Sequence, residues 1–455
     1  MTALESAWSA VGGDPALLER VSAVVREGAL TARLPVREAA RACVGACALA
    51  AAEAGARRAG LAGVPAVRLD DGAIATAFTS ERHLLVDGRA PVWFAPLSRF
   101  WPAADGWVRT HANYPHHRAA LTAALGVSRD DPDAVAAAVA ERPAREVEDA
   151  VYAAGGLAVA LRTPAEWAAH EQAAEVARSP LVGRERTAPA RARALPPLDG
   201  TPLLPAAGVR VLDLTRVIAG PVATRTLALL GADVLRVDPP RLPELADQHT
   251  DTGFGKRSAL LDAAADRRAL EELPAAADVV VTGYRPGALD RLGLSARALT
   301  ERWPHLVVAE LSAWGAHGPW GGRRGFDSLV QVATGIAVTE GSAGRPGALP
   351  AQALDHGTGY LLAAAVLRAL TDRDEDGRGS CLSLSLARTA HWLTHEVGEG
   401  PAGDAVYEAP DAWLAERDSP LGRLRYALPP VTFEGGPRDW ARPPGAWGAD
   451  PARWL

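Results

Sequence analysis

The chain has 455 residues, a formal net charge of −6 and a pI near 6.0, and is long enough for two or three domains with hydrophobic cores. This acidic balance gives no basic patch at the level of the whole chain, so nucleic acid is not expected as a partner. Cys43, Cys47 and Cys381 are too few and too scattered for a disulfide framework. No paired Cys/His set accompanies them, so no metal is expected.

The start of the chain carries no charged segment followed by an apolar one, the pattern of a secretory signal. No stretch reaches the ~18 apolar residues of a membrane span. We therefore expect a cytoplasmic protein without a membrane partner.

Residues 1–185 are predicted to hold a helical segment followed by a small α+β unit. Helical periodicity runs through 14–62. Short strands are predicted at 64–69, 83–88 and 106–110, and helices at 117–125, 133–141 and 144–154. Residues 186–205, in which Arg, Ala and Pro alternate, are predicted to be a linker.

Residues 206–395 alternate apolar strands with helices. The predicted strands are 209–214, 233–237, 276–282 and 306–311, and helices are predicted at 222–230 and 295–302. This alternation predicts an α/β fold with a doubly wound, parallel, Rossmann-like sheet, separate from the smaller α+β domain. Ligands of such sheets bind beyond the carboxyl ends of the strands. Residues 396–455 are predicted to be a tail that packs back on this unit.

Asp355 stands at the predicted start of a helix, before the apolar run 361–370. A carboxylate at a helix N-cap accepts the free backbone N–H groups of the first turn, and the helix dipole favours its ionised form. The small residues Gly357, Thr358 and Gly359 leave room beside it. On these residues alone a structural cap is the first interpretation, and a poised nucleophile is the second.

Short motifs in the second unit occur in the order that they have in one enzyme family, the class III CoA-transferases (CaiB/BaiF), which this unit resembles. They are the segments 208–215, 219–221, 230–234, 255–258, 284–287 with 289–294, 314–315 with 318–319, 325–327, 334–335, 355–359 and 377–379. Each motif is weak alone, but the ordered set is specific.

The resemblance implies a CoA-transferase in which Asp355 attacks an acyl-CoA thioester. An aspartyl-CoA thioester then forms, and a carboxylic acid takes the CoA from it. Covalent catalysis of this kind divides one difficult exchange into easier steps. Backbone N–H groups at 357–359 are expected to support the developing charge. CoA is thus implied as part of the substrate, with no prosthetic group.

For CoA, the resemblance assigns Arg285 and Tyr284 to the nucleotide end, since an Arg at a strand end pairs well with phosphate. Lys256 and Arg257 are expected to add positive charge near the phosphates, and Arg216 is a further candidate. For Lys256, a solvated surface charge is an equal alternative.

Two alternatives remain open. Racemases of the same fold use a His/Asp pair, and their His falls at the position of Phe326, which cannot carry a proton. An acyl-CoA racemase or isomerase with another base is one alternative, and a degenerate, non-catalytic CoA-binding protein is the other. Gly155 and Gly156 are the nearest match to the family's shielding Gly-rich loop, although a helix end is the better interpretation of this pair.

The order of the units differs from that of the family. Residues 105–109 and 162–182 resemble the family's small domain, which ordinarily follows the catalytic unit and here precedes it. Members of the family are interlocked dimers, so a homodimer is expected.

Overall fold

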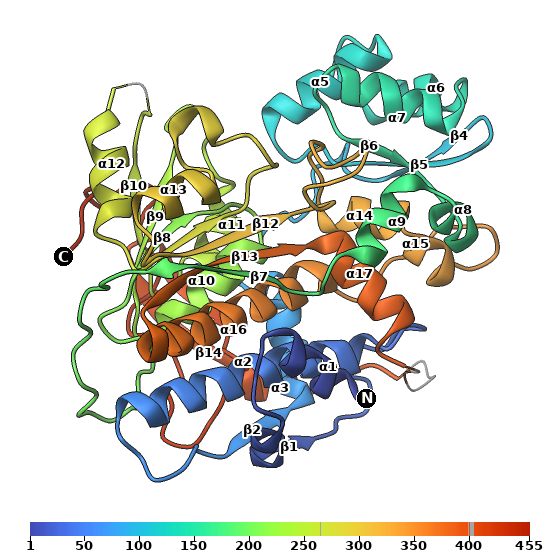
Figure 1. Ribbon diagram of the computed structural model, residues 1–455. Helices are drawn as coiled ribbons and strands as arrows, with labels where there is room; N and C mark the ends of the chain where they lie inside the picture. The colour runs from blue at the N-terminus through green and yellow to red at the C-terminus, as the bar shows by residue number, and fades with distance from the viewer. Residues whose placement is uncertain (264, 399, 401–404) are drawn as a thin grey trace.

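In the computed structural model, which describes residues 1–263, 265–398, 400 and 405–455, seven strands form one mixed sheet (Figure 1). Its order is β10-β9-β8-β11-β12-β13-β7, and neighbouring strands are parallel except β13 and β7. The strands are β7 (Gly183–Pro189), β8 (Arg210–Leu214), β9 (Asp233–Asp238), β10 (Arg257–Leu260), β11 (Val279–Thr282), β12 (Val307–Ser312) and β13 (Arg378–Ser385).

Both faces of the sheet are covered, which explains its nearly continuous Val and Leu runs. Side chains that alternate along β11 belong to different cores: Val279 and Val281 join one, and Val280 joins the other. The helices that bound these layers and the edges of the sheet are α10 (Ala219–Leu229), α11 (Ala246–Thr252), α12 (Arg267–Ala275), α13 (Ala296–Arg302), α14 (Asp327–Ala333), α15 (Ile336–Thr339), α16 (Ala353–Asp376) and α17 (Leu386–His395).

The helix α2 (Val36–Arg58) forms an outer layer against α16 (Figure 1). Its small side chains permit a close approach: a Cβ added at Gly357 of α16 would lie 3.5 Å from Sγ of Cys43. By length and composition α2 also resembles a membrane span, but 94% of its apolar window is buried inside the protein. It therefore packs as a core helix.

The predicted region 1–185 is divided between two places in the fold. Its first elements pack around α2: α1 (Ala3–Ala10), η1 (Pro15–Arg20), β1 (Val21–Val24), β2 (Val67–Asp70), α3 (Asp71–Phe78), α4 (Ser80–His83) and β3 (Leu85–Val86). The three strands predicted in succession do not pair with one another. Instead, β2 pairs with β1, β3 pairs with a strand near the C-terminus, and the strand at 106–110 pairs with two other strands.

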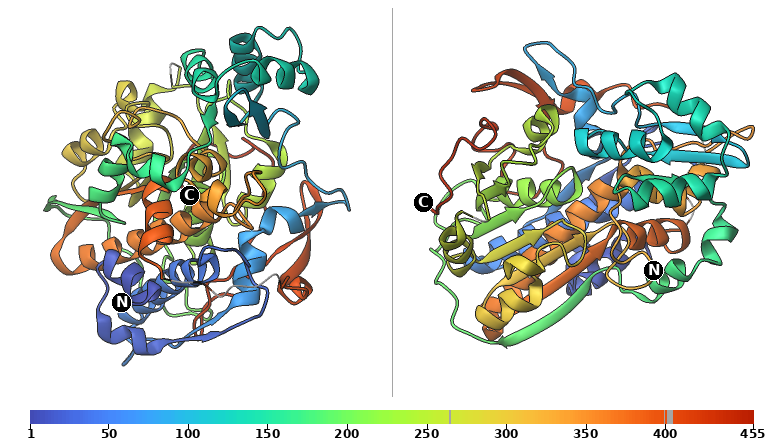
Figure 2. Two further views of the ribbon diagram at one scale, coloured as in Figure 1. Left: turned by 90° about the vertical axis from the view of Figure 1, so that its right-hand side faces the viewer. Right: turned by 90° about the horizontal axis from the view of Figure 1, so that it is seen from above.

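The later part of that region forms a smaller unit with a core of its own, above the sheet in Figure 1 and at the top of the left view of Figure 2. It holds β4 (Phe100–Ala103), β5 (Gly106–Thr110), α5 (Pro115–Leu125), α6 (Pro132–Ala140), α7 (Ala144–Ala153) and β6 (Ala158–Ala160). The chain then returns through α8 (Pro164–Ala168) and α9 (Glu171–Arg178) to β7. Because β7 includes residues 186–189, the start of the predicted linker is in fact the antiparallel edge of the sheet.

The C-terminal tail contacts both halves of the chain. After η3 (Pro410–Trp413), the strands β14 (Leu414–Ser419) and β15 (Gly422–Ala427) form a hairpin, and β15 pairs with β3. Further on, Trp447 donates to Asp238 at 3.0 Å, and Trp454 donates to the carbonyl of Leu273 at 3.0 Å, on the sheet unit. Residues 399 and 401–404 of the predicted tail lie outside the described part of the chain.

A buried ion pair joins the smaller unit to the sheet unit. Glu148 on α7, which is 2% exposed, accepts from Arg162 at 2.9 Å and from Arg323, in the loop after β12, at 3.1 Å. Its Oε2 also accepts the backbone N–H of Ala160 at 2.8 Å. The carboxylate therefore holds together three segments that are distant in the sequence.

We expect Glu148→Gln to lower the free energy of unfolding by roughly 3 kcal/mol, because it leaves the buried guanidinium of Arg162 without its anion. Chemical denaturation measures the change. Glu146→Gln, on the exposed side of the same helix, is the matched control, and an equal loss in both variants would contradict the argument.

Candidate active site

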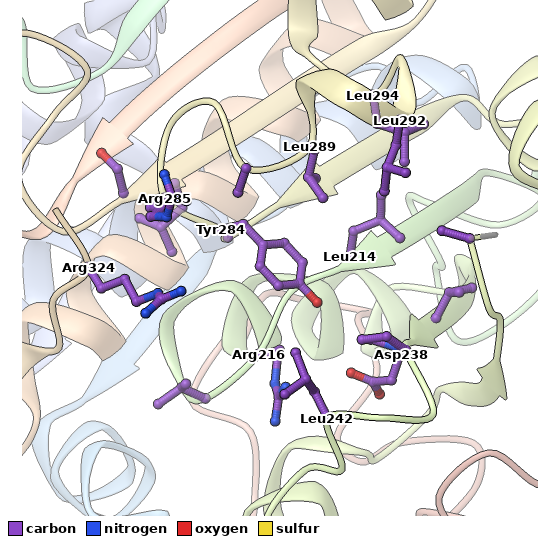
Figure 3. A pocket seen from close by; sticks show the side chains of 18 of the residues that line it. Leu214, Arg216, Asp238, Leu242, Tyr284, Arg285, Leu289, Leu292, Leu294 and Arg324 are labelled. Carbon is purple, nitrogen blue, oxygen red and sulfur yellow. The ribbon is translucent and has the colours of Figure 1, made fainter. Parts of the chain in front are cut away.

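One large cavity of about 1060 Å³ opens beyond the carboxyl ends of β8, β9, β11 and β12 (Figure 3). Side chains at the strand ends form its floor, and the smaller unit contributes Tyr114, His116 and His117. Asp355 lines the same cavity. The place agrees with the rule that ligands of such sheets bind beyond the strand ends.

Asp355 is not the N-cap of its helix, contrary to the prediction. The N-cap of α16 is Gln352, whose side chain makes no cap hydrogen bond, and Asp355 is the third helical residue. The cap is supplied by another element: the Asp327 carboxylate, at the start of α14, accepts the backbone N–H of Asp355 at 2.9 Å. The Asp355 side chain therefore does not cap its own helix, although the sequence suggested that it would.

The Asp355 carboxyl group lies in an environment that opposes its charge, again contrary to the prediction. The residue is 6% exposed. Burial raises its pKa well above the usual range, and the nearby carboxylates of Asp327 and Glu81 raise it further. Burial also raises the pKa of Asp327, but the backbone N–H of Asp355 and the Gln331 side chain donate to that carboxylate. Asp327 is therefore the better stabilised anion of the pair, and Asp355 holds the proton more tightly.

The backbone N–H groups at Gly357, Thr358 and Gly359 do not face the cavity as free donors, which corrects another expectation. These residues lie past the first turn of α16, where each N–H is bonded to the carbonyl four residues earlier. The N–H of His356 already donates to the carbonyl of Gln352 at 3.0 Å.

An aromatic cluster beside Asp355 was not predicted. Phe326 stacks on His111 with ring centroids 3.7 Å apart and planes 5° from parallel, and the His117 ring lies 6.0 Å from Phe326. Both histidines come from the smaller unit, so two imidazole rings from a segment distant in the sequence pack against Phe326. Gly155, with φ of 82°, directly follows the C-cap of α7, Ala154, which agrees with the interpretation of this pair as a helix end.

The segment that carries these histidines is anchored to the sheet unit by Tyr114. Its hydroxyl donates to Glu244 at 2.5 Å, and the Arg216 guanidinium lies 4.9 Å above its ring. Burial alone would raise the pKa of Glu244, but Arg236 and Arg216 hold it at about 2. An ionised Glu244 therefore fastens the smaller unit at the mouth of the cavity.

Three of the five predicted CoA-binding residues, Arg285, Tyr284 and Arg216, line the cavity (Figure 3). Arg285 is exposed, and its side chain has no hydrogen bond or ion pair among the residues that the structure describes. Arg216 is partly committed, because it donates to the carbonyl of Pro243 at 2.8 Å and pairs with Glu244.

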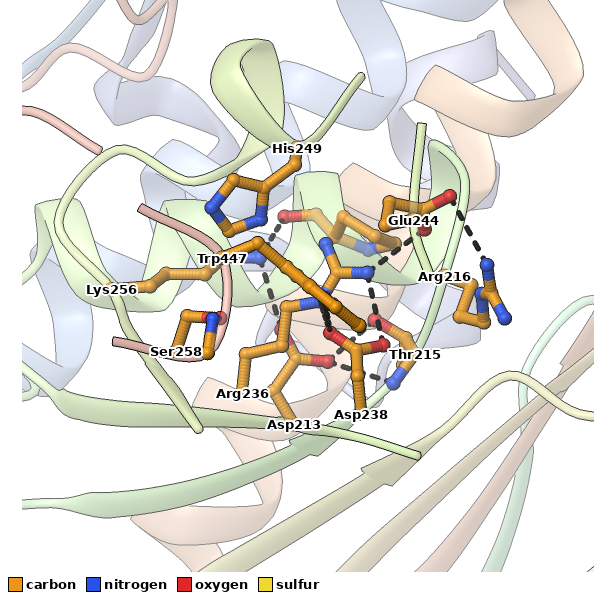
Figure 4. A network of polar contacts seen from close by, with 12 residues as sticks. Asp213, Thr215, Arg216, Arg236, Asp238, Glu244, His249, Lys256, Ser258 and Trp447 are labelled. Carbon is orange, nitrogen blue, oxygen red and sulfur yellow. Dashed lines mark hydrogen bonds and ion pairs between the residues drawn. The ribbon is translucent and has the colours of Figure 1, made fainter. Parts of the chain in front are cut away.

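Lys256 and Arg257 do not line the cavity, which corrects both predictions. Figure 4 shows Lys256 within a network of polar contacts that includes Asp213. Lys256 is 5% exposed and donates to Asp213 at 3.0 Å and to Thr224 at 2.6 Å. Burial lowers its pKa to about 8. The alternative of a solvated surface charge is also wrong. Arg257 is held by Asp233 at 2.8 Å. Each of the two cations is paired with a carboxylate inside the fold, so neither is available to bind a phosphate of a ligand.

Other arginines occupy the place predicted for Lys256 and Arg257. Arg241, Arg267 and Arg291 line the cavity, and in the described part of the chain their side chains have no hydrogen bond or ion pair. Arg241 follows the predicted strand 233–237 by four residues, a signal that the sequence contains. Arg291 lies inside the motif 289–294, which also marks it in the sequence. Nothing local marks Arg267, since only the fold brings it to the cavity.

Comparison with known proteins agrees with the resemblance seen in the sequence. Residues 206–404 match the family model described as CoA-transferase family III. A probable fatty acyl-CoA transferase, Rv3272 of Mycobacterium tuberculosis, is 35% identical over 204 residues, which are 41% of this chain and 51% of that protein. A formyl-CoA:oxalate CoA-transferase of Streptomyces coelicolor is 35% identical over 259 residues, 51% of this chain and 62% of the relative.

An acetyl-coenzyme A transferase, nodX of Hypoxylon pulicicidum, is 35% identical over 212 residues, 45% of this chain and 36% of the relative. The chain thus spans about half the length of the curated relatives that it matches. A crystal structure of Rv3272 aligns with a TM-score of 0.39 at 36% identity, and covers 41% of this chain and 55% of that one.

Removal of the helix cap tests the geometry at Asp355. We expect Asp327→Ala to lower the free energy of unfolding by about 2 kcal/mol, because the backbone N–H of Asp355 and the amide of Gln331 lose their buried acceptor. Asp327→Asn keeps an acceptor oxygen and is expected to cost less. Denaturation of both variants measures the difference, and equal stability of Asp327→Ala and the wild type would refute the cap.

Proposed function

We propose that the protein is an enzyme that moves CoA from an acyl-CoA thioester to a carboxylic acid, because residues 206–404 match the model of CoA-transferase family III. The observation that carries the proposal is that Asp355 lines the same cavity as a set of unpaired arginines at the carboxyl edge of the sheet. A carboxylate nucleophile and a cationic site for phosphates are the two groups that such a transfer needs.

Asp355 is the proposed nucleophile. Its carboxylate oxygen attacks the thioester carbonyl, the C–S bond breaks, and CoA leaves as thiolate with a mixed anhydride behind. The thiolate attacks the Asp355 carbonyl of the anhydride and releases the donor acid as carboxylate. The acceptor carboxylate then attacks the aspartyl-CoA thioester, and the expelled thiolate attacks the acceptor carbonyl of the second anhydride. Asp355 is regenerated as carboxylate with no net proton or electron.

Arg285, Tyr284 and Arg216 are the proposed contacts for CoA, joined by Arg241 and Arg291. An unpaired guanidinium at a strand end binds phosphate oxygens through paired N–H groups. Arg241, Arg285 and Arg291 are exposed, so no ion pair of theirs within the described residues must be broken before a phosphate binds, whereas Arg216 also pairs with Glu244.

We also propose that the sheet is Rossmann-like and that the smaller unit is a separate domain. Support for the first comes from the strand order: numbered from β8 to β13, the six parallel strands have the order 3-2-1-4-5-6. Support for the second comes from its own hydrophobic core. The homodimer and the cytoplasmic location remain predictions.

The covalent intermediate is the decisive test. We expect incubation with acyl-CoA followed by hydroxylamine to convert Asp355 into a hydroxamate, because the aspartyl thioester is cleaved by amines, and peptide mass spectrometry locates the product. Asp355→Asn should lose both the adduct and the transfer of CoA. Asp327→Asn keeps the nucleophile and should retain the adduct. Transfer by a protein in which Asp355 stays unmodified would overturn the assignment.

The pH dependence of the first half-reaction follows from the raised pKa of Asp355. Only the ionised carboxyl attacks, so the rate should rise with pH as Asp355 loses its proton. Glu81→Gln removes one of the negative charges that raise this pKa, and the rising limb should move to lower pH. The measurement is the pH profile of single-turnover adduct formation.

Glu301→Gln is the control for that shift, since Glu301 is an exposed carboxylate on α13 paired with Arg297. Its profile should coincide with that of the wild type. A profile of Glu81→Gln that does not move, or that moves to higher pH, would contradict the argument.

A second candidate, an acyl-CoA racemase or isomerase, is favoured by one observation. His117 lines the cavity with Asp355, and burial, with smaller effects of His116 and two arginines, lowers its pKa to about 3. A neutral imidazole near a carboxyl group has the composition of an acid–base pair. Deuterium exchange at the α-carbon of acyl-CoA without any acceptor acid would support this candidate, and its loss in His117→Phe would assign the base.

A further inference from the structure

Arg324 is an unpaired cation directed into the cavity. Its backbone is fixed, because its carbonyl accepts from the Tyr152 hydroxyl at 3.0 Å and from Nε1 of Trp314 at 3.1 Å. Figure 3 shows the guanidinium reaching toward the cavity centre. Within the described ranges, its side chain makes one long contact, 3.4 Å to the carbonyl of Gly155, and no ion pair. Its neighbour Arg323 is instead paired with Glu148 at 3.1 Å.

His117 is a second polar group at the cavity without a partner. The residue is 5% exposed and lines the cavity. Its Nδ1 is buried without a hydrogen bond, and neither ring nitrogen has a partner in the part of the chain that the structure describes. The neutral ring keeps one N–H donor. The other nitrogen, Nε2, is not among the fully buried side-chain atoms, so an oxygen of a ligand in the cavity can accept a hydrogen bond from an N–H at this position.

Both groups lie at the Asp355 end of the cavity. Arg324 precedes Phe326 by two residues, so their Cα atoms are within about 7 Å, and the His117 ring contacts Phe326. The next residue, Asp327, caps the helix turn that carries Asp355. Leu292 and Leu294, next to Arg291 in the chain, lie at the opposite end of the cavity in Figure 3. Arg291, one of the arginines proposed to bind CoA, is therefore remote from Arg324.

We propose that Arg324 and His117 bind a second carboxylate on the acid that receives CoA, so that the acceptor is a dicarboxylic acid. The inference rests on the proposed function. When the reacting carboxylate of an acceptor meets the aspartyl thioester at Asp355, a monocarboxylic acid leaves Arg324 and His117 unpaired. A second carboxylate satisfies both with charge-assisted hydrogen bonds. The subsite is assembled from two units, since His117 lies on α5 and Arg324 follows β12.

The test compares acceptors of equal chain length that differ in one carboxylate, succinate and butyrate, with a fixed acyl-CoA donor. We expect the wild type to prefer succinate in kcat/KM by about tenfold or more, the size of a charged hydrogen bond. Arg324→Gln should bring the ratio close to one. His117→Phe, which keeps the ring packed on Phe326 but removes the donor, should reduce the ratio as well.

Arg291→Gln is the matched control, because Arg291 is also a cavity-lining arginine without a partner. It should raise KM for acyl-CoA and keep the ratio of succinate to butyrate. A wild type without preference overturns the proposal. So does an Arg324→Gln variant that keeps the wild-type ratio and, like Arg291→Gln, only raises KM for acyl-CoA, which would assign Arg324 to a CoA phosphate.

Failure of the proposed function is distinguishable from these outcomes. If CoA passes to no acid and Asp355 forms no adduct, the function fails, and calorimetric titration of succinate then decides the subsite. Tighter binding of succinate by the wild type than by Arg324→Gln supports it, and equal binding overturns it.

Discussion

The hydrogen bond from the backbone N–H of Asp355 to the Asp327 carboxylate links the starts of two helices, and the chemistry of the cavity depends on it. Because Asp327 serves as the cap, the Asp355 side chain is left without a structural partner. The same contact places a second carboxyl group beside it, and this neighbour, together with burial, keeps Asp355 protonated more tightly than an ordinary carboxyl. Structural support and control of reactivity therefore come from one residue.

The cavity also depends on the contacts that hold the smaller unit against the sheet unit. Glu148 and Glu244 each pair with arginines, and together they hold the unit at two points. Glu244 binds Tyr114, and His117 follows Tyr114 by less than one helical turn, so the anchor and the cavity-lining ring move together. The smaller unit thus meets the cavity of its own chain although it precedes the sheet in the sequence.

The sequence predicted most of the sheet, because its strands are short, apolar and buried on both faces. It also indicated Asp355 and Arg285, which stand in ordered motifs. It failed where a role depends on contacts between distant segments. Lys256 looks like a surface cation, yet Asp213, 43 residues earlier, neutralises it inside the fold. The capping of α16 by Asp327 and the approach of His117 to Phe326 are likewise tertiary, and no local pattern encodes them. The edge strand β7 was hidden in a segment rich in Arg and Ala, where pairing with β13 overrides composition.

The pairing of β3 with β15 has a consequence for how the chain is synthesised. Leu85 and Val86 find their strand partners only at Arg425 and Leu424, so residues 87–423 must all be synthesised before this sheet closes. Pairings of such large sequence separation form late and slowly. The apolar surface of α2 likewise has no partner until α16, which is also synthesised late, has been made. The apolar residues of this early part of the chain are therefore exposed until their late partners have been made, and exposed apolar surface of this kind promotes aggregation during folding.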